Sequence, residues 1–155
     1  MIIRRSLLNV FVLIGVVLLG SSVAFAQEGK GALFAVLSGG YEVDGETGEA
    51  NVGDGNGHGS ATMLLVGQDT VCYGVTVNRI DGPVAMHVHE GAAGSNGGVV
   101  IGLTPPDTGS PGSVSDCVGE LDIQLLRKIF RNPANYYINV HNPAFPGGAI
   151  RGQLH

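Results

Sequence analysis

Short apolar segments flanked by turn residues dominate this chain after residue 26, and they constrain its fold more than any other feature. Each segment is only five to seven residues long and has Gly, Pro, Asn or Asp at or near its ends, as strands joined by turns do. The predicted strands are Ala32–Ser38, Ser60–Val66, Val71–Val77, Val84–His89, Val99–Leu103, Tyr136–His141 and Ala149–Leu154. We therefore predict an all-β fold, an antiparallel β-sandwich or Greek-key barrel of about seven to eight strands.

One segment has helical rather than strand periodicity. Between Asp122 and Arg131 the sequence DIQLLRKIFR places its apolar residues on one stripe, with basic residues near the end. That stripe consists of Ile123, Leu126, Ile129 and Phe130. Asn132-Pro133 is expected to end this short helix. Two long loops are also expected, an acidic Gly-rich one at Asp44–Gly59 and a Pro, Gly and Ser-rich one at Thr104–Ser115.

The N-terminus has the three parts of a secretory signal peptide. Arg4 and Arg5 precede an apolar run, Val10–Leu19, and the small residues of Ala24-Phe25-Ala26 follow it. The apolar run is shorter than the ~20 residues that usually span a bilayer, which disfavours a retained anchor. We expect residues 1–26 to be removed and residues 27–155 to form a single domain that is periplasmic or secreted, with no membrane segment after cleavage.

The charge of the exported part argues against nucleic acid as a partner. Cleavage removes Arg4 and Arg5 but no acidic residue, so the formal net charge changes from −5 to −7. An acidic surface repels phosphate backbones.

The two cysteines, Cys72 and Cys117, lie in the part that would meet an oxidising compartment. A disulfide between them would close a loop of about 45 residues and add about 3 to 4 kcal/mol of stability. The alternative is two separate buried thiols. Their spacing fits neither a zinc knuckle nor a CxxC redox pair.

Two histidines in the segment AMHVHEG are the leading candidates for chemistry. Side chains alternate across a strand, so His87 and His89 share one face. The residues expected on the opposite, core-facing side are Val84, Met86 and Val88. In Tyr136–His141 the same alternation puts Asn139 and His141 on the face opposite an apolar row of Tyr136, Ile138 and Val140.

Three imidazoles would converge if these two strands pair or face one cleft. Nitrogen ligands suit copper or zinc better than calcium or magnesium, and each nitrogen must come within about 2.0 to 2.1 Å of the ion. His87, His89 and His141 are therefore candidate ligands of a copper-class ion. The alternative is that they are ordinary surface histidines, or donors that hold a loop through its carbonyls.

Other candidate sites have less support in the sequence. Asp54-Gly55-Asn56-Gly57 offers oxygen ligands for calcium but lacks the closing Glu of an EF-hand. Arg151 would guide an anion if it lay beside the histidines, whereas pairing with an acid or a backbone carbonyl would make it structural. No serine lies in a G-x-S-x-G nucleophile elbow, so the sequence assigns no catalytic residue.

Two long motifs and two shorter ones resemble the chordin-type (CHRD) domain. They are GYEV at 40–43, GSAT at 59–62, MHVHEGAAGSNGGVV at 86–100, and YINVH at 137–141 followed by FPGGAIRGQL at 145–154. The resemblance implies an extracytoplasmic β-rich domain, found alone in exported bacterial proteins and as repeats in a secreted animal antagonist of growth factors, with no established catalytic activity. Asp44 and Gly98 stand where the family often has Pro.

A second resemblance, to copper-zinc superoxide dismutase, is confined to the histidines. That family carries an H-V-H-E segment with two copper ligands and a further copper histidine late in the chain, which His87, His89 and His141 would match. No histidine lies between His89 and His141, so the bridging and zinc-binding histidines have no counterpart.

The leading functional hypothesis is an exported, non-catalytic binding or structural module that holds a copper-class ion. Its partner would be that ion or an unidentified extracytoplasmic protein. The rival hypotheses are a dismutase-like copper redox enzyme, with an open coordination position for a small oxidant, and a pure protein-binding domain whose histidines are ordinary polar residues.

Overall fold

The computed structural model describes residues 31–155, so the predicted signal peptide lies outside the described part of the chain. The eight strands are β1 (Ala32–Ser38), β2 (His58–Val66), β3 (Thr70–Asn78), β4 (Ala85–Glu90), β5 (Val99–Leu103), β6 (Gly112–Val118), β7 (Tyr136–His141) and β8 (Ile150–Gln153). They form one antiparallel sheet in the order β5-β4-β7-β8-β1-β2-β3-β6. The prediction of an all-β fold is confirmed.

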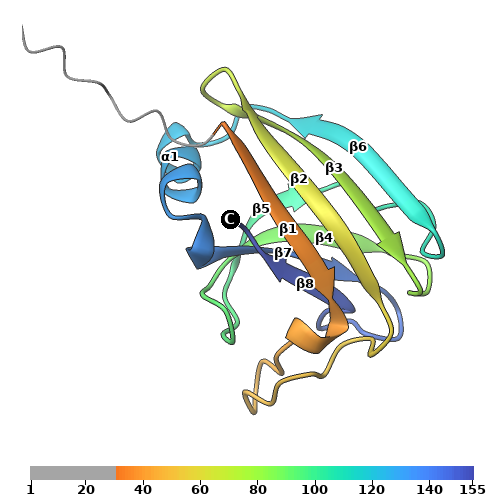
Figure 1. The fold of residues 1–155 in the computed structure, drawn as a ribbon. Coiled ribbons are helices and arrows are strands. Elements are labelled where there is room, and N and C mark those ends of the chain that lie inside the picture. The colour runs from red at the N-terminus through yellow and green to blue at the C-terminus, as the bar shows by residue number, and fades with distance from the viewer. Residues whose placement is uncertain (1–30) are drawn as a thin grey trace, which may run out of the picture.

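The sheet curls into a nearly closed barrel. Strands β1, β2, β3 and β6 form one wall and cross the wall made by β5, β4, β7 and β8 (Figure 1). The walls meet where Ser38 of β1 pairs with Arg151 of β8. Side chains bridge the opposite seam: Thr104, just after β5, donates its N–H to the Tyr73 hydroxyl (2.7 Å) and its own hydroxyl to Asp116 of β6 (2.7 Å).

The barrel interior is a continuous apolar core. Alternation supplies it, because every second residue of β1, β3 and β7, and of β4 as far as Val88, is apolar and buried. Those residues are Leu33, Ala35, Leu37, Val71, Tyr73, Val75, Val77, Met86, Val88, Tyr136, Ile138 and Val140. These buried side chains thus fix which face of each strand points away from the core.

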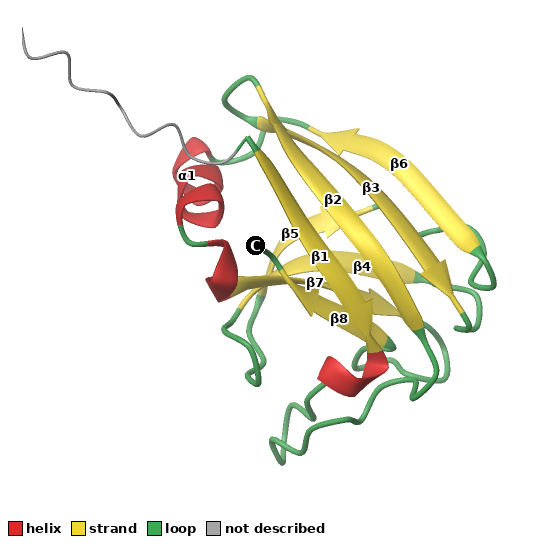
Figure 2. Ribbon diagram, viewed as in Figure 1, coloured by secondary structure: helices red, strands yellow, loops and turns green. Residues whose placement is uncertain are grey.

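One end of the barrel is covered by α1 (Ile123–Arg131), which confirms the predicted helix (Figure 2). The Asp122 carboxylate caps it by accepting the N–H of Gln124 (2.8 Å). Of the predicted stripe, Leu126, Ile129 and Phe130 are buried in the core, and Ile123 is only half-buried. The chain then passes through a 3-10 turn at Pro133–Asn135 into β7.

Three details of the predicted secondary structure are wrong. The expected loop Thr104–Ser115 contains the start of β6, a strand that was not predicted. Its Ser113 and Ser115 are exposed and polar, and Val114 and Val118 on the other side are only half-buried, so its apolar alternation is weak. Val84 is not a core residue: it precedes β4 and is 62% exposed. In addition, β2 begins at His58, two residues earlier than predicted.

The predicted disulfide between Cys72 and Cys117 is confirmed. The two residues are direct partners in the β3–β6 pairing, so the bond fastens the edge strand β6 to the barrel. Such a bond is typical of proteins from an oxidising compartment. Within residues 31–155 no helix is both long enough and apolar enough to cross a membrane.

Candidate metal centre

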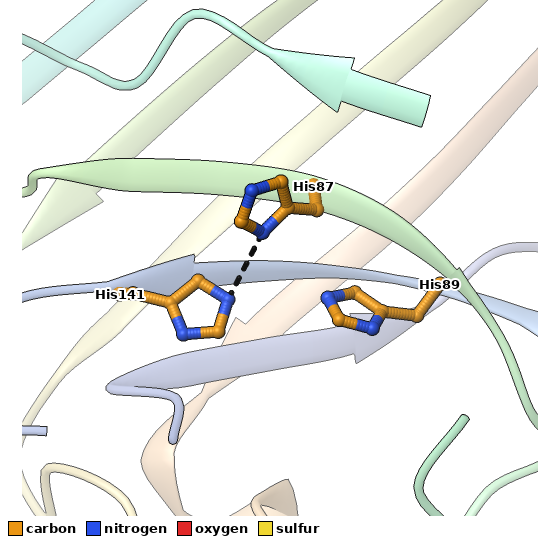
Figure 3. A group of neighbouring side chains, drawn as sticks. All are labelled: His87, His89 and His141. Carbon is orange, nitrogen blue, oxygen red and sulfur yellow. Dashed lines mark hydrogen bonds between the residues drawn. The ribbon is translucent and has the colours of Figure 1, made fainter. Parts of the chain in front are cut away.

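The three predicted histidine ligands come together on the outer face of the barrel (Figure 3). Strands β4 and β7 are neighbours, and their register places His87 opposite Asn139 and Ala85 opposite His141. His87, His89 and His141 therefore lie on one face, away from the core. One nitrogen from each ring lies within 4.8 Å of the other two, and this is the only such group of three or more His, Cys, Asp or Glu side chains within residues 31–155.

His141 has its ring orientation set by a backbone carbonyl. Its Nδ1 lies 3.0 Å from the carbonyl oxygen of Pro146, so Nδ1 carries the proton and donates it. The neutral ring then has a free lone pair on Nε2, which lies 3.2 Å from Nδ1 of His87 and accepts a hydrogen bond from it. Figure 3 shows this contact as the dashed line.

His89 is oriented in the same way but is the most buried of the three, at 8% exposed. Its Nδ1 donates to the carbonyl of Gly97 (3.0 Å). This fixes the lone pair on Nε2, which is buried and has no hydrogen-bond partner. A buried polar atom without a partner is uncommon and requires a physical explanation.

The pKa values of two of these rings favour the neutral, metal-binding form. Desolvation lowers the pKa of His87, and repulsion from His89 lowers it further. Desolvation also lowers the pKa of His141; the hydrogen bond to Pro146 raises it in part, and repulsion from the other two rings lowers it. Metals bind unprotonated imidazole, so these shifts reduce the competition from protons.

The geometry suits a nitrogen-bound ion after a small rearrangement. Bonds of about 2.0 to 2.1 Å allow two ligand nitrogens to be at most about 4 Å apart. Nδ1 of His87 and Nε2 of His141, 3.2 Å apart, already meet this limit. The nitrogens of the three rings lie as much as 4.8 Å apart, so binding one ion calls for a slight ring rotation. In His89 and His141 the ring nitrogen that would not bind the ion, Nδ1, donates to a backbone carbonyl. Metal-binding histidines usually have such a partner on their second nitrogen.

A family model of the CHRD domain matches residues 33–154, nearly the whole of the described part of the chain. The chain belongs to the CHRD domain family. No curated protein and no solved structure matches it. The matched segment of this CHRD domain includes all three histidines and all of the barrel except the first residue of β1.

Arg151 has a structural role in this CHRD domain. It is only 2% exposed. Its guanidinium donates to the carbonyls of Tyr41 (2.5 Å) and Ser95 (3.1 Å) and to Oδ1 of Asn96 (2.7 Å). The backbone-carbonyl alternative is therefore the one the structure shows. Arg151 joins two loops to the outer face of β8.

The acidic loop of the CHRD domain has no cluster of carboxylates suited to calcium. Asp54 instead accepts the N–H of Asn56 (3.3 Å) in a local turn. Asp44 likewise accepts the N–H groups of Glu46 and Thr47. The hydrogen bonds from Thr47 and Glu46 lower the pKa of Asp44, which marks a turn rather than an ion site.

Sequence reasoning missed a buried carboxyl group that contacts Asn139, the cross-strand partner of His87. Glu42 is 1% exposed and accepts a hydrogen bond from the Asn139 amide (3.5 Å). Burial raises the pKa of Glu42 to about 7, although the charge of Arg151 and the bond from Asn139 oppose the rise. Its Oε1 and the Asn139 Oδ1 are both buried acceptors without a donor. Nothing in the acidic sequence around Glu42 signals this burial, because a loop fold creates it.

Tyr137 was also missed, although strand alternation contains the signal. It lies directly opposite His89 in the β4–β7 pairing and is 2% exposed. Its ring stacks on that of His89, with centroids 4.9 Å apart and planes 8° from parallel. Alternation from Asn139 and His141 places Tyr137 on their face, so its burial is not part of the barrel core.

Proposed function

We propose that this CHRD domain is an exported, non-catalytic binding module that holds a copper-class ion through His87 Nδ1, His89 Nε2 and His141 Nε2. The observation that carries the proposal is the Nε2 atom of His89, which is buried, has no hydrogen-bond partner and faces the rings of His87 and His141 (Figure 3). One nitrogen from each of the three rings lies within 4.8 Å of the other two. An ion bound there would give this lone pair a partner. It would also replace the hydrogen bond between His87 and His141.

The donor set favours copper over zinc and disfavours calcium or magnesium. It consists of three imidazoles with no carboxylate, and copper(II) stands at the top of the affinity order for nitrogen ligands. His89 and His141 already have the required tautomer, since their Nδ1 protons bond carbonyls. His87 has to move its proton to Nε2 for Nδ1 to bind, so we expect it to be the ligand that adjusts most.

The proposed location is the periplasm or the extracellular medium. The confirmed disulfide supports an oxidising compartment, and the N-terminal sequence has the features of a signal peptide. Any macromolecular partner would then be an extracytoplasmic protein. The net charge of −7 after cleavage disfavours nucleic acid.

Copper(II) titration of the purified chain, followed by calorimetry and electron spin resonance, tests the proposal. We expect one ion per chain, with nitrogen couplings from three imidazoles, and an affinity at least about 100-fold lower in His89→Ala and His141→Ala. His58→Ala is the matched control, because His58 is an exposed histidine that bonds the nearby Asn56 carbonyl. Absence of stoichiometric binding, or binding unchanged in His87→Ala, contradicts the proposal.

A dismutase-like redox enzyme is the second candidate, and one feature favours it. Three protein ligands would leave a coordination position for a small oxidant. This candidate predicts superoxide turnover by the copper-loaded chain that disappears in His141→Ala. Activity no higher than that of the same concentration of free copper would exclude it and leave the binding module.

A further inference from the structure

Tyr137, Gly97 and His89 form a closed ring of contacts beside the candidate metal centre. His89 donates its Nδ1 proton to the Gly97 carbonyl (3.0 Å), and the Gly97 N–H donates to the Tyr137 hydroxyl (3.3 Å). The Tyr137 ring closes the circuit by stacking on the imidazole of His89. Each of the three residues thus constrains the other two.

Tyr137 is itself held on the side away from His89. Strand β7 lies between β4, which carries His89, and β8, which carries Arg151. The Arg151 guanidinium carbon lies 4.6 Å from the centroid of the Tyr137 ring, a cation–π distance. Because Arg151 is fixed by three loop acceptors, the Tyr137 ring has little freedom to leave the imidazole.

The backbone of Gly97 packs closely against that of Glu90, and this holds the Gly97 carbonyl in place as a hydrogen-bond acceptor. A Cβ at this position would lie 1.6 Å from the carbonyl oxygen of Glu90, so no other residue fits without moving the backbone. The neighbouring Gly98 carbonyl accepts the Glu90 N–H (3.0 Å), which ties the same turn to the end of β4. The Gly97 carbonyl therefore has a set position relative to the strand that carries His89.

We infer that Tyr137 is a positioning residue for the metal centre: together with Gly97 it sets the tautomer and ring plane of His89, so that Nε2 faces His87 and His141. This inference rests on the proposed function for its purpose. The orientation itself does not depend on an ion, and that separation makes it testable in metal-free protein. Partners behind a metal-binding histidine typically change metal affinity by about 10- to 100-fold when removed.

Tyr137→Leu is the main test, since it removes both the stacking ring and the hydroxyl. In metal-free protein, nitrogen-15 NMR is expected to show His89 as the Nδ1–H tautomer in the wild type and as a mixture of tautomers in the variant. Copper affinity is expected to fall about 10- to 100-fold, and spin resonance to show two nitrogen couplings in place of three. A single Nδ1–H tautomer in folded Tyr137→Leu overturns the inference.

Two conservative variants separate the hydroxyl from general loss of stability. Tyr137→Phe keeps the ring, so the tautomer should persist while the Gly97 amide exchanges with solvent at least about tenfold faster. Tyr73→Phe removes a similar hydroxyl bond, to the Thr104 N–H at the seam between β5 and β6, and should leave Gly97 unchanged. If Tyr137→Leu does not fold, unchanged Gly97 exchange in Tyr137→Phe overturns the inference. A correct tautomer without copper binding would instead contradict only the proposed function.

Discussion

Both faces of the wall formed by β4, β7 and β8 carry buried side chains, but these are covered by different means. On the inner face Met86, Val88, Ile138 and Val140 are 0% exposed and pack against strands across the barrel. On the outer face the buried residues are polar or aromatic, namely His89, Tyr137, Asn139 and Arg151. Loops cover this second face, and no opposing sheet is involved.

The outer face depends on loop carbonyls, and this explains what it can do. His89, His141 and Arg151 each donate to a backbone carbonyl of a loop, from Gly97, Pro146, and Tyr41 and Ser95, respectively. Apolar packing inside the barrel fixes shape alone, whereas these bonds fix tautomers and ring directions. The candidate metal centre therefore lies on the outer face, where side chains are only partly buried and are held by directional hydrogen bonds.

The largest effect is expected on the inner face. Ile138→Ala empties space at the middle of β7, where the side chain is 0% exposed, and should lower the free energy of unfolding by about 4 kcal/mol. Urea unfolding measures it, with Val99→Ala as the control because Val99 is 54% exposed. A loss below about 1 kcal/mol would mean that the barrel core is not the main source of stability.

A smaller effect, with a characteristic pH dependence, is expected from Glu42 on the outer face. Its pKa is about 7 in the folded chain against an ordinary 4.5, so the folded state keeps a proton that the unfolded chain has released between these two values. Stability should therefore fall by about 3 kcal/mol as pH rises from 4.5 through 7, and then level off. Glu42→Gln cannot ionise and should unfold with a flatter pH profile.

Urea unfolding at pH 4.5, 6 and 8 distinguishes burial of Glu42 from a general charge effect. Glu42→Gln should match the wild type at pH 4.5 and exceed it at pH 8 by up to about 3 kcal/mol. Glu46→Gln removes an exposed carboxylate from the same loop and should leave the wild-type profile in place. Parallel profiles for the wild type and Glu42→Gln would show that Glu42 is not buried as a neutral acid.

The same contrast explains what the sequence could predict. Inner-face residues follow a period of two, so the fold class, most of the strands and the shared face of His87, His89 and His141 could be inferred from local pattern. Cys72 and Cys117 could be paired because two cysteines allow one intramolecular bond. Strand β6 was missed because an edge strand needs little apolar alternation.

Most contacts on the outer face could not be predicted from the local sequence pattern. Burial of Glu42 depends on where the loop after β1 folds, and the role of Gly97 depends on a contact with a strand 40 residues later. Arg151 had two alternatives that only its distant partners could separate. Tyr137 is the exception, because strand alternation from Asn139 and His141 already placed it on the outer face.

The smallest effect is expected at an exposed position on β1, in the other wall of the barrel, and the same substitution at an exposed and a buried valine gives the sharpest comparison. Val36 of β1 is 62% exposed, whereas Val88 of β4 is 0% exposed. Val36→Thr keeps the branched shape and should change the free energy of unfolding by no more than about 0.5 kcal/mol. Val88→Thr buries a hydroxyl inside the barrel and should cost about 1 to 3 kcal/mol. Equal costs in urea unfolding would contradict the distinction between exposed outward positions and the packed interior of the barrel.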